Sequence, residues 1–166
     1  MAKEKTVLID LIDTKVLVNA KPGSILKYDL TRYCRGRVTD ATLEVIEDKG
    51  QLKAIFKRLR LVQSYVKRLV RKGTSWVEDS FQVKAKDKLM RIKPLLVTRK
   101  KVSRSIKKHL REKCRELIEK FVTKSTARDV FNAIITGVLQ KSMSKELKRI
   151  YPLAVCEIRW VETKEK

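Results

Sequence analysis

The chain has 166 residues, 43% of them hydrophobic, and a formal net charge of +22. This length and composition predict a single domain, residues 1–166, with a true hydrophobic core. So large a positive charge points to a polyanionic partner such as nucleic acid. No apolar run approaches the roughly eighteen residues of a membrane span, and Asp10 and Asp13 interrupt the first apolar stretch, so we expect neither a membrane span nor a signal peptide.

Residues 1–34 are predicted to form either extra strands or an extended arm. Two runs rich in β-branched residues, 6–12 and 15–20, flank Asp13. The sequence Pro22-Gly23-Ser24 then predicts a turn.

Two longer strands are predicted next, at residues 35–46 and 52–62, joined by an acidic turn at 47–50. The first alternates imperfectly between polar and apolar residues, which predicts a bulge near Ala41. The second mixes apolar residues with four cations, so we expect a strand with a basic face.

A short helix and a hairpin follow. Apolar and basic residues separate onto two sides over residues 63–72, with Gly73 at the place of a C-terminal cap. Alternating residues on both sides of a turn at 86–87 predict a β-hairpin that begins after Trp76. Pro94 predicts an edge position or the end of regular pairing.

The last third of the chain is predicted to be mainly helical. A long basic helix at residues 99–123 is followed by a second helix that starts at Thr126, which has capping-box spacing to Asp129 and an apolar side through Leu139. A third, short helix spans 144–150, and residues 154–161 form a final strand whose apolar face includes Trp160.

These elements predict an α+β fold. We expect an N-terminal and central, mostly antiparallel β-sheet or barrel-like unit, a long basic helix, two shorter helices and a C-terminal strand. The alternating strand-helix order of a nucleotide-binding sheet is not the pattern found here.

The charge is concentrated in residues 51–124, which carry 24 Lys or Arg against 6 acids and therefore hold +18 of the +22. Within the long helix, apolar residues from Val102 to Phe121 recur at spacings of three and four. A row of cations recurs in the same way on what we interpret as the opposite side. The row comprises Arg104, Lys108, Arg111 and Arg115, with Lys107 at its rim.

A charged helix face is often simply solvated, and Glu112, Glu116 and Glu119 beside the row can supply local partners. The density of cations around the helix favours a ligand instead. A rigid row of Arg and Lys can span several phosphates of folded RNA without reading sequence.

Further candidate RNA contacts lie on both sides of the hairpin. Four are expected in the short helix and three at the junction before the long helix, where a helix start also favours phosphate. These are Lys67, Arg68, Arg71 and Lys72, and Arg99, Lys100 and Lys101. Trp76 is the candidate for stacking on an unpaired base, whereas Trp160 is expected in the core.

The sequence contains no pattern typical of an enzyme or a metal site. There is no glycine-rich phosphate loop, no paired Cys-x-x-Cys ligands and no His-x-Glu motif. The three cysteines are far apart, which favours reduced thiols. We therefore expect no catalytic residues, no metal and no cofactor.

Several sequence blocks between residues 35 and 161 carry a resemblance to a known family. They are, in order, GRV and its strand at 36–45, RLVRKGTSWVEDSFQVKAKDK at 68–88, LMRIKPLLVTRKK at 89–101, the basic helix through Ile118, and KRIYPLAVCEIRW at 148–160. In this order they resemble the archaeal-type small-subunit ribosomal proteins of the S-one-e family, older name S-three-A-e. The chain departs from that family between Val62 and Val66, where a segment is missing, and in its opening residues.

The resemblance implies a structural constituent of the small ribosomal subunit that supports translation. It implies binding to ribosomal RNA in the platform region near the messenger RNA exit, neighbouring small-subunit ribosomal proteins as further partners, a cytoplasmic location in the ribosome, and no catalytic site. Charge alone leaves open a free-standing RNA- or DNA-binding protein of the chaperone or chromatin type.

Overall fold

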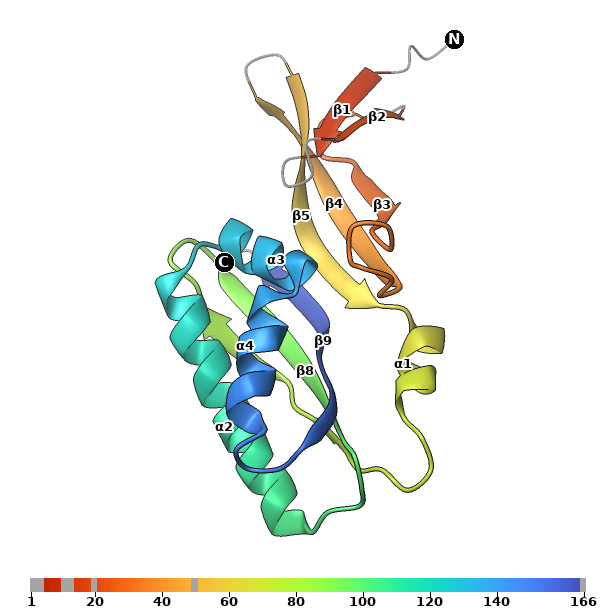
Figure 1. The fold of residues 1–166 in the computed structure, drawn as a ribbon. Helices are drawn as coiled ribbons and strands as arrows, with labels where there is room; N and C mark the ends of the chain where they lie inside the picture. The colour runs from red at the N-terminus through yellow and green to blue at the C-terminus, as the bar shows by residue number, and fades with distance from the viewer. Residues whose placement is uncertain (1–4, 10–13, 19–20, 49–50, 165–166) are drawn as a thin grey trace.

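The computed structural model describes residues 5–9, 14–18, 21–48 and 51–164, and within these ranges it contains nine strands and four helices. The strands are β1 (Lys5–Ile9), β2 (Thr14–Val18), β3 (Ile25–Asp29), β4 (Thr39–Asp48), β5 (Gln51–Leu61), β6 (Trp76–Glu78), β7 (Phe81–Lys84), β8 (Leu89–Thr98) and β9 (Leu153–Lys164). The helices are α1 (Gln63–Leu69), α2 (Arg104–Lys124), α3 (Ala127–Thr136) and α4 (Val138–Leu147). The predicted α+β class is confirmed (Figure 1).

All nine strands belong to one sheet with the order β2-β1-β5-β9-β8-β6, to which β4 and β3 attach through β5, and β7 through β8. Every pairing among the described strands is antiparallel except that of β1 with β5. These pairings leave the sheet open, so the barrel-like alternative was wrong.

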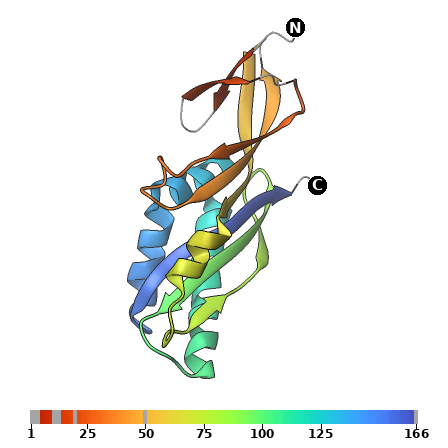
Figure 2. The same cartoon turned by 90° about the vertical axis from the view of Figure 1, so that its right-hand side faces the viewer.

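Helices cover both faces of the sheet. The main core lies between the sheet and α2, α3 and α4, while α1 packs on the other face over a small cluster formed by Leu61, Val66, Leu95 and Val97. Figure 2 shows α1 and α2 on opposite sides of the sheet.

The N-terminal segment forms strands and not an arm in its described part, where β1 pairs with β2 and with β5. Residues 10–13 and 19–20 of the predicted runs lie outside the described residues. Strand β3 was not predicted, because its five residues place only Leu26 and Tyr28 toward the core.

Strand β4 begins at Thr39, four residues later than predicted, because the chain turns over residues 31–36. Arg35 and Gly36 have φ angles of 53° and 78°, which no strand accommodates. The predicted irregularity near Ala41 is found between Thr42 and Leu43, and the extra residue is Lys57 on β5. Strand β4 continues to Asp48, so Glu47 and Asp48 belong to the strand and not to the predicted acidic turn, and residues 49–50 lie outside the described residues.

Two predicted breaks fall elsewhere. Helix α1 ends at Leu69, where Val70 is already extended, so Gly73 occupies a later turn and is not the helix cap. Pro94 does not end pairing, because β8 continues to Thr98 and lies between β9 and β6. The ladder accommodates this proline at a register shift between Lys93 and Pro94.

The same register shift overturns the placement of Trp160 in the core. Lys93 pairs with Trp160 and Pro94 with Ile158, so Arg159 is an extra residue in β9. Without this bulge Ile158 and Trp160 would share a face. With it, Val161 takes the buried side and the Trp160 ring lies on the other face, between Arg58 and Lys93.

The helical third departs from the prediction at its start and in its middle: α2 begins at Arg104 and not at Arg99, because residues 99–103 form a loop between β8 and the helix. The capping box of Thr126 and Asp129 is confirmed at the start of α3. The predicted second helix is divided at Gly137, whose φ of 77° ends α3, and α4 begins at Val138. Val138 was predicted on the apolar side of that helix, but it is 59% exposed. The predicted third helix, 144–150, overlaps only the last turn of α4, which ends at Leu147, and residues 148–150 form a turn.

Helix α2 is anchored by Leu110, Cys114, Ile118 and Val122, which are buried along its length. Burying an aliphatic side chain of this size contributes about 1.5–3 kcal/mol. The helix is therefore held as a rigid element against the sheet.

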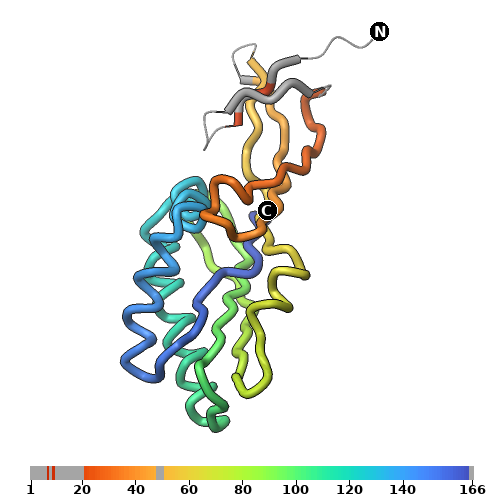
Figure 3. Tube along the Cα trace, turned by 45° about the vertical axis from the view of Figure 1, so that its right-hand side comes forward, coloured from red at the N-terminus to blue at the C-terminus, as the bar shows by residue number. Residues whose placement is uncertain are grey.

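One buried ion pair joins three parts of the chain. The Arg37 Nη1 donates to Glu157 Oε2 at 3.1 Å, with side-chain exposures of 12% and 17%. Arg37 Nη2 also donates to the Ile135 carbonyl at 2.6 Å, at the end of α3. The loop after β3, the end of α3 and strand β9 are thus tied together, and Figure 3 shows this loop beside the α3–α4 junction.

We expect R37M to lower the free energy of unfolding by about 3 kcal/mol, because it leaves the buried Glu157 carboxylate without its counter-charge. Urea unfolding at pH 7 measures this, with the exposed neighbour Arg35 as the control: R35M should change stability by less than about 0.5 kcal/mol. Adding Glu157→Gln to R37M should restore part of the loss. Equal urea midpoints for the two single variants would contradict this role of Arg37.

On the surface of α2, Glu116 lies between two lysines. Lys113 Nζ is 2.8 Å from Glu116 Oε2, and Lys120 binds Oε1. Hydrogen bonds from Lys113 and Lys120 lower the pKa of Glu116 from 4.5 to about 2.

A depressed folded-state pKa means that these pairs contribute stability above pH 4.5 and lose it as the pH falls from 4.5 to about 2. In a carbon-13 NMR titration at low salt, we expect the Glu116 carboxyl to titrate near 2 in the unaltered protein and near 4.5 in the K113Q/K120Q variant. About 1 M salt should raise the first midpoint by screening. A midpoint near 4.5 in unaltered protein at low salt would show that the pairs are not formed in solution.

Candidate nucleic-acid interface

The twelve predicted cations are almost all available to a ligand. All are exposed except Lys107, which is half-buried. They come from three elements: α1 with the loop after it, the loop before α2, and α2 itself.

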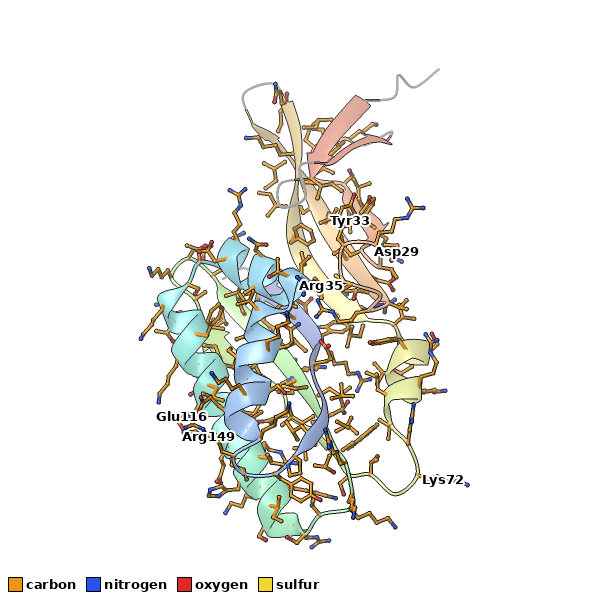
Figure 4. All side chains as sticks on the ribbon, viewed as in Figure 1. Asp29, Tyr33, Arg35, Lys72, Glu116 and Arg149 are labelled. Atoms are coloured by element: carbon orange, nitrogen blue, oxygen red, sulfur yellow. The ribbon has the colours of Figure 1, made fainter. Side chains whose placement is uncertain are left out.

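Two of these groups meet at one end of the molecule. Ser75 joins the loop after α1 to the loop before α2: its carbonyl accepts from the Thr98 backbone N–H at 2.9 Å, and its Oγ accepts from the Val102 N–H at 3.2 Å. We call the cations of these two loops the basic end, which comprises Arg71, Lys72, Arg99, Lys100 and Lys101. Figure 4 shows Lys72 extending into solvent from its loop.

Trp76 lies beside the basic end at the start of β6, and its side chain is 49% exposed. An exposed indole next to five cations is what stacking on an unpaired base requires. Stacking by Trp76 stays a prediction.

The row on α2 starts at the basic end with Arg104 and continues up the helix. Lys108 is 3.9 Å from Glu112, a loose contact between exposed groups. Arg111 Nε donates to the Glu78 carbonyl at 3.3 Å, and Arg115 Nη2 to Asp79 Oδ2 at 3.0 Å.

The two halves of the row, Arg104 with Lys108 and Arg111 with Arg115, therefore differ in their contacts. Arg111 and Arg115 contact the β6–β7 edge of the sheet, and the Arg115 guanidinium lies 5.0 Å from the centre of the Phe81 ring. At 3.6 residues per turn the row is roughly 100° from the buried stripe. The row therefore flanks that stripe, and the prediction that it lies on the opposite side of the helix was wrong. All four members of the row are exposed, but Arg111 and Arg115 are also bound by groups of the β6–β7 segment.

Lys67 and Arg68 are separated from the α2 row, because α1 lies on the other face of the sheet (Figure 2). Arg68 stacks 5.7 Å from the Tyr65 ring centre. The predicted contacts thus form two faces that converge at the basic end.

The acids of the central segment are mostly occupied within the protein. Glu78 accepts from Arg159 at 2.6 Å, Asp79 from Arg115, and Asp87 from the Ala127 backbone N–H at 2.8 Å. Glu78 and Asp87 thus bind groups outside the twelve predicted cations, whereas Asp79 binds Arg115 of the α2 row.

The sequence pattern missed one cationic feature. Arg58 lies 4.8 Å and Lys93 5.2 Å from the Trp160 ring centre on the sheet face opposite α2. Only the bulge at Arg159 reveals this cluster, and no spacing rule identifies an extra residue in advance.

Within the described ranges, no group of three or more His, Cys, Asp or Glu side chains is placed to hold a metal ion. The three cysteines are free and buried, and burial raises the pKa of Cys114 to about 12. None of the helices in the described part of the chain combines the length and apolarity needed to cross a membrane.

Comparison with known proteins gives a consistent result. The chain is 25% identical over 146 residues to the small ribosomal subunit protein eS1 of Methanothermobacter thermautotrophicus, which covers 82% of this chain and 75% of the relative. It is 33% identical over 114 residues to the eS1 of Ignicoccus hospitalis, covering 67% of this chain and 54% of the relative. For the eS1 of Saccharolobus islandicus the identity is 28% over 166 residues, with 89% and 79% covered.

The family model described as the ribosomal S3Ae family matches residues 25–166. This range excludes β1 and β2 and contains every predicted RNA contact, in agreement with the departure noted in the opening residues. The chain belongs to the ribosomal S3Ae family.

Proposed function

We propose that this chain is a structural component of the small ribosomal subunit, in which the basic end and the α2 row bind ribosomal RNA. The observation that supports this most is a surplus of exposed cations on elements anchored by buried side chains, in a chain whose relatives are named small ribosomal subunit proteins. Because the backbone of these elements is already ordered, phosphate binding requires the ordering of the exposed Lys and Arg side chains only.

The binding mode follows from the geometry. Arg104, Lys108 and the loop cations bind phosphates on one side of the sheet, and Lys67 and Arg68 bind a second RNA segment on the other. Such contacts position a protein on RNA by shape and charge and carry little sequence information. Trp76 adds stacking where a base is unpaired.

The wider assignment is also part of this proposal. The chain acts as a scaffold in the cytoplasmic ribosome, next to other small-subunit proteins and near the messenger RNA exit, and performs no catalysis. A free-standing RNA- or DNA-binding protein is the alternative outcome of the experiment that follows.

The chain, expressed with an affinity tag in an archaeal host, should co-sediment with small ribosomal subunits and remain bound through a high-salt wash, because many phosphate contacts inside a particle are lost together or not at all. Sucrose-gradient fractions probed for the tag measure this. Recovery only in soluble fractions or on DNA would contradict the ribosomal assignment and favour the free-standing alternative.

The R104Q/K108Q variant should bind small-subunit ribosomal RNA more weakly, with a salt dependence shallower by about 0.7–0.9 per lost phosphate contact. Filter binding at several salt concentrations measures both quantities. K113Q/K120Q is the matched control, since it also removes two α2 charges, but these are engaged by Glu116. If both variants lose affinity equally, net charge and not the α2 row determines binding.

A further inference from the structure

The sheet face opposite α2 carries two rows of accessible side chains that cross strands β3, β4, β5, β9 and β8. Directly paired residues of neighbouring strands point to the same face of a sheet. One row is Lys27, Thr42, Arg58, Glu162 and Arg91, and the other is Asp29, Asp40, Arg60, Trp160 and Lys93. The residues between the two rows are buried on the other face, against the helices; they are Ala41, Leu59, Ile92 and Val161. We call the two rows the outer face; none of their members is buried.

A hollow of about 320 Å³ lies at one end of the outer face, over β3, β4 and β5. Its lining includes Lys27, Asp29, Asp40, Thr42, Arg58 and Arg60. The volume is at the lower end of the range of pockets that hold small ligands. Charged and hydroxyl groups dominate this lining, so the hollow favours a polar ligand, and one nucleotide has the right size and chemistry.

Arg58 forms the wall of the hollow on the side of Trp160, because β5 lies between β4 and β9. Its guanidinium carbon is 4.8 Å from the centre of the Trp160 ring. Glu162 holds it there: Arg58 Nε donates to Glu162 Oε1 at 3.1 Å, and Nη2 binds the same oxygen. A guanidinium is planar, so with one side on the indole its other side is turned toward the hollow. Arg58 thus offers a fixed flat surface of the kind on which RNA bases stack.

Two cations flank this stacking surface. Lys27 lies in the hollow, and Lys93 lies beyond Trp160, 5.2 Å from the centre of its ring. Arg58 and Arg60 are paired with Glu162 and Asp40, whereas Lys27 and Lys93 form no ion pair within the described part of the chain. The phosphates on the two sides of a stacked base therefore meet one lysine each. Asp29 and Asp40 can accept hydrogen bonds from ribose hydroxyl groups.

We propose that the outer face binds a short single-stranded RNA segment, with one base stacked on the Arg58 guanidinium in the hollow and the flanking phosphates on Lys27 and Lys93. The inference rests on the proposed function, because it takes RNA to be the partner. It adds a surface that neither the basic end nor the α2 row includes.

The stacking surface decides between the possible partners. A duplex keeps its bases stacked inside and has none to place in the hollow, whereas the bases of a single strand are free to stack on the protein. An acidic protein segment is the competing partner, since it would also be attracted to the cations. It gains nothing from a flat guanidinium fixed on an indole, so RNA is the better match.

The two tryptophans of the chain, Trp76 and Trp160, allow the test. A nitrogen-15 spectrum of the whole chain shows one indole N–H signal for each, and the W76F variant assigns them. Titration with hexauridylate should shift the Trp160 signal until it saturates, while an oligoglutamate of the same charge leaves it in place. A Trp160 signal that ignores the RNA, or that responds equally to both ligands, would overturn the proposal.

R58K tests the stacking itself, because it keeps the positive charge beside Glu162 and removes the planar group. It should weaken hexauridylate binding about tenfold. R149K is the matched control: Arg149 is also paired with a glutamate, Glu146 at 3.3 Å, and lies outside the outer face. Its affinity should be that of the unaltered chain. Equal affinities of the two variants would refute stacking on Arg58.

K27Q/K93Q tests the phosphate contacts and breaks no ion pair within the described residues. The same titration, repeated at several salt concentrations, should give a salt dependence shallower by about 0.7 per lost phosphate contact. The Trp160 signal should still shift at saturation, because the stacking surface remains. An unchanged salt dependence would contradict the placing of phosphates on these two lysines.

These titrations contain no ribosomal subunit, so their result is independent of co-sedimentation. A chain that co-sediments but whose Trp160 signal ignores hexauridylate would refute the role of the outer face alone. A chain whose Trp160 signal responds but that never co-sediments would refute the ribosomal assignment alone.

Discussion

The position of β9 between β5 and β8 is the constraint on which the architecture depends. Its ladder with β8 runs from Leu153 to Lys164, and its shorter ladder with β5 joins the N-terminal strands to the helical half. Because both edges of β9 are paired, the sheet is continuous, and α2–α4 and α1 have a common surface to pack against on its two faces. The basic end and the α2 row are fixed in space only through that surface.

The cationic and the apolar residues of the central segment lie on different sides of the same elements. The cations of the central segment occupy helix flanks and loops, while the same elements bury apolar stripes beneath them. Two of the nearby acids, Glu78 and Asp79, bind arginines of the protein itself, Arg159 and Arg115. A chain of charge +22 can therefore retain a well-packed core and still offer phosphates a surface with a large excess of cations.

The sequence predicted elements whose signals are local. The capping box at Thr126, the periodicity of α2 and the β7–β8 hairpin are each specified by residues a few positions apart, and all three are present. The errors arise where tertiary pairing decides. The bulge at Arg159 depends on Pro94 in the neighbouring strand, and only that partner shows why Trp160 faces outward.

The same distinction applies to the candidate site. Composition identified the cations of α2 and the two loops, but helix periodicity alone did not show that Arg111 and Arg115 turn toward the β6–β7 edge. The ion pair of Arg37 and Glu157 lies beyond sequence reasoning, because its two members are more than a hundred positions apart. Contacts at that separation follow from the fold and from no local pattern.

The place of β9 in the sheet also bears on how the protein is made. Every other described strand and helix leaves the synthesising ribosome before it, so β5 and β8 emerge with facing edges that have no partner. Non-local pairings form late, and open strand edges expose nascent chains to misassembly. The strongly cationic middle of the chain is thus translated before the strand that makes its sheet continuous.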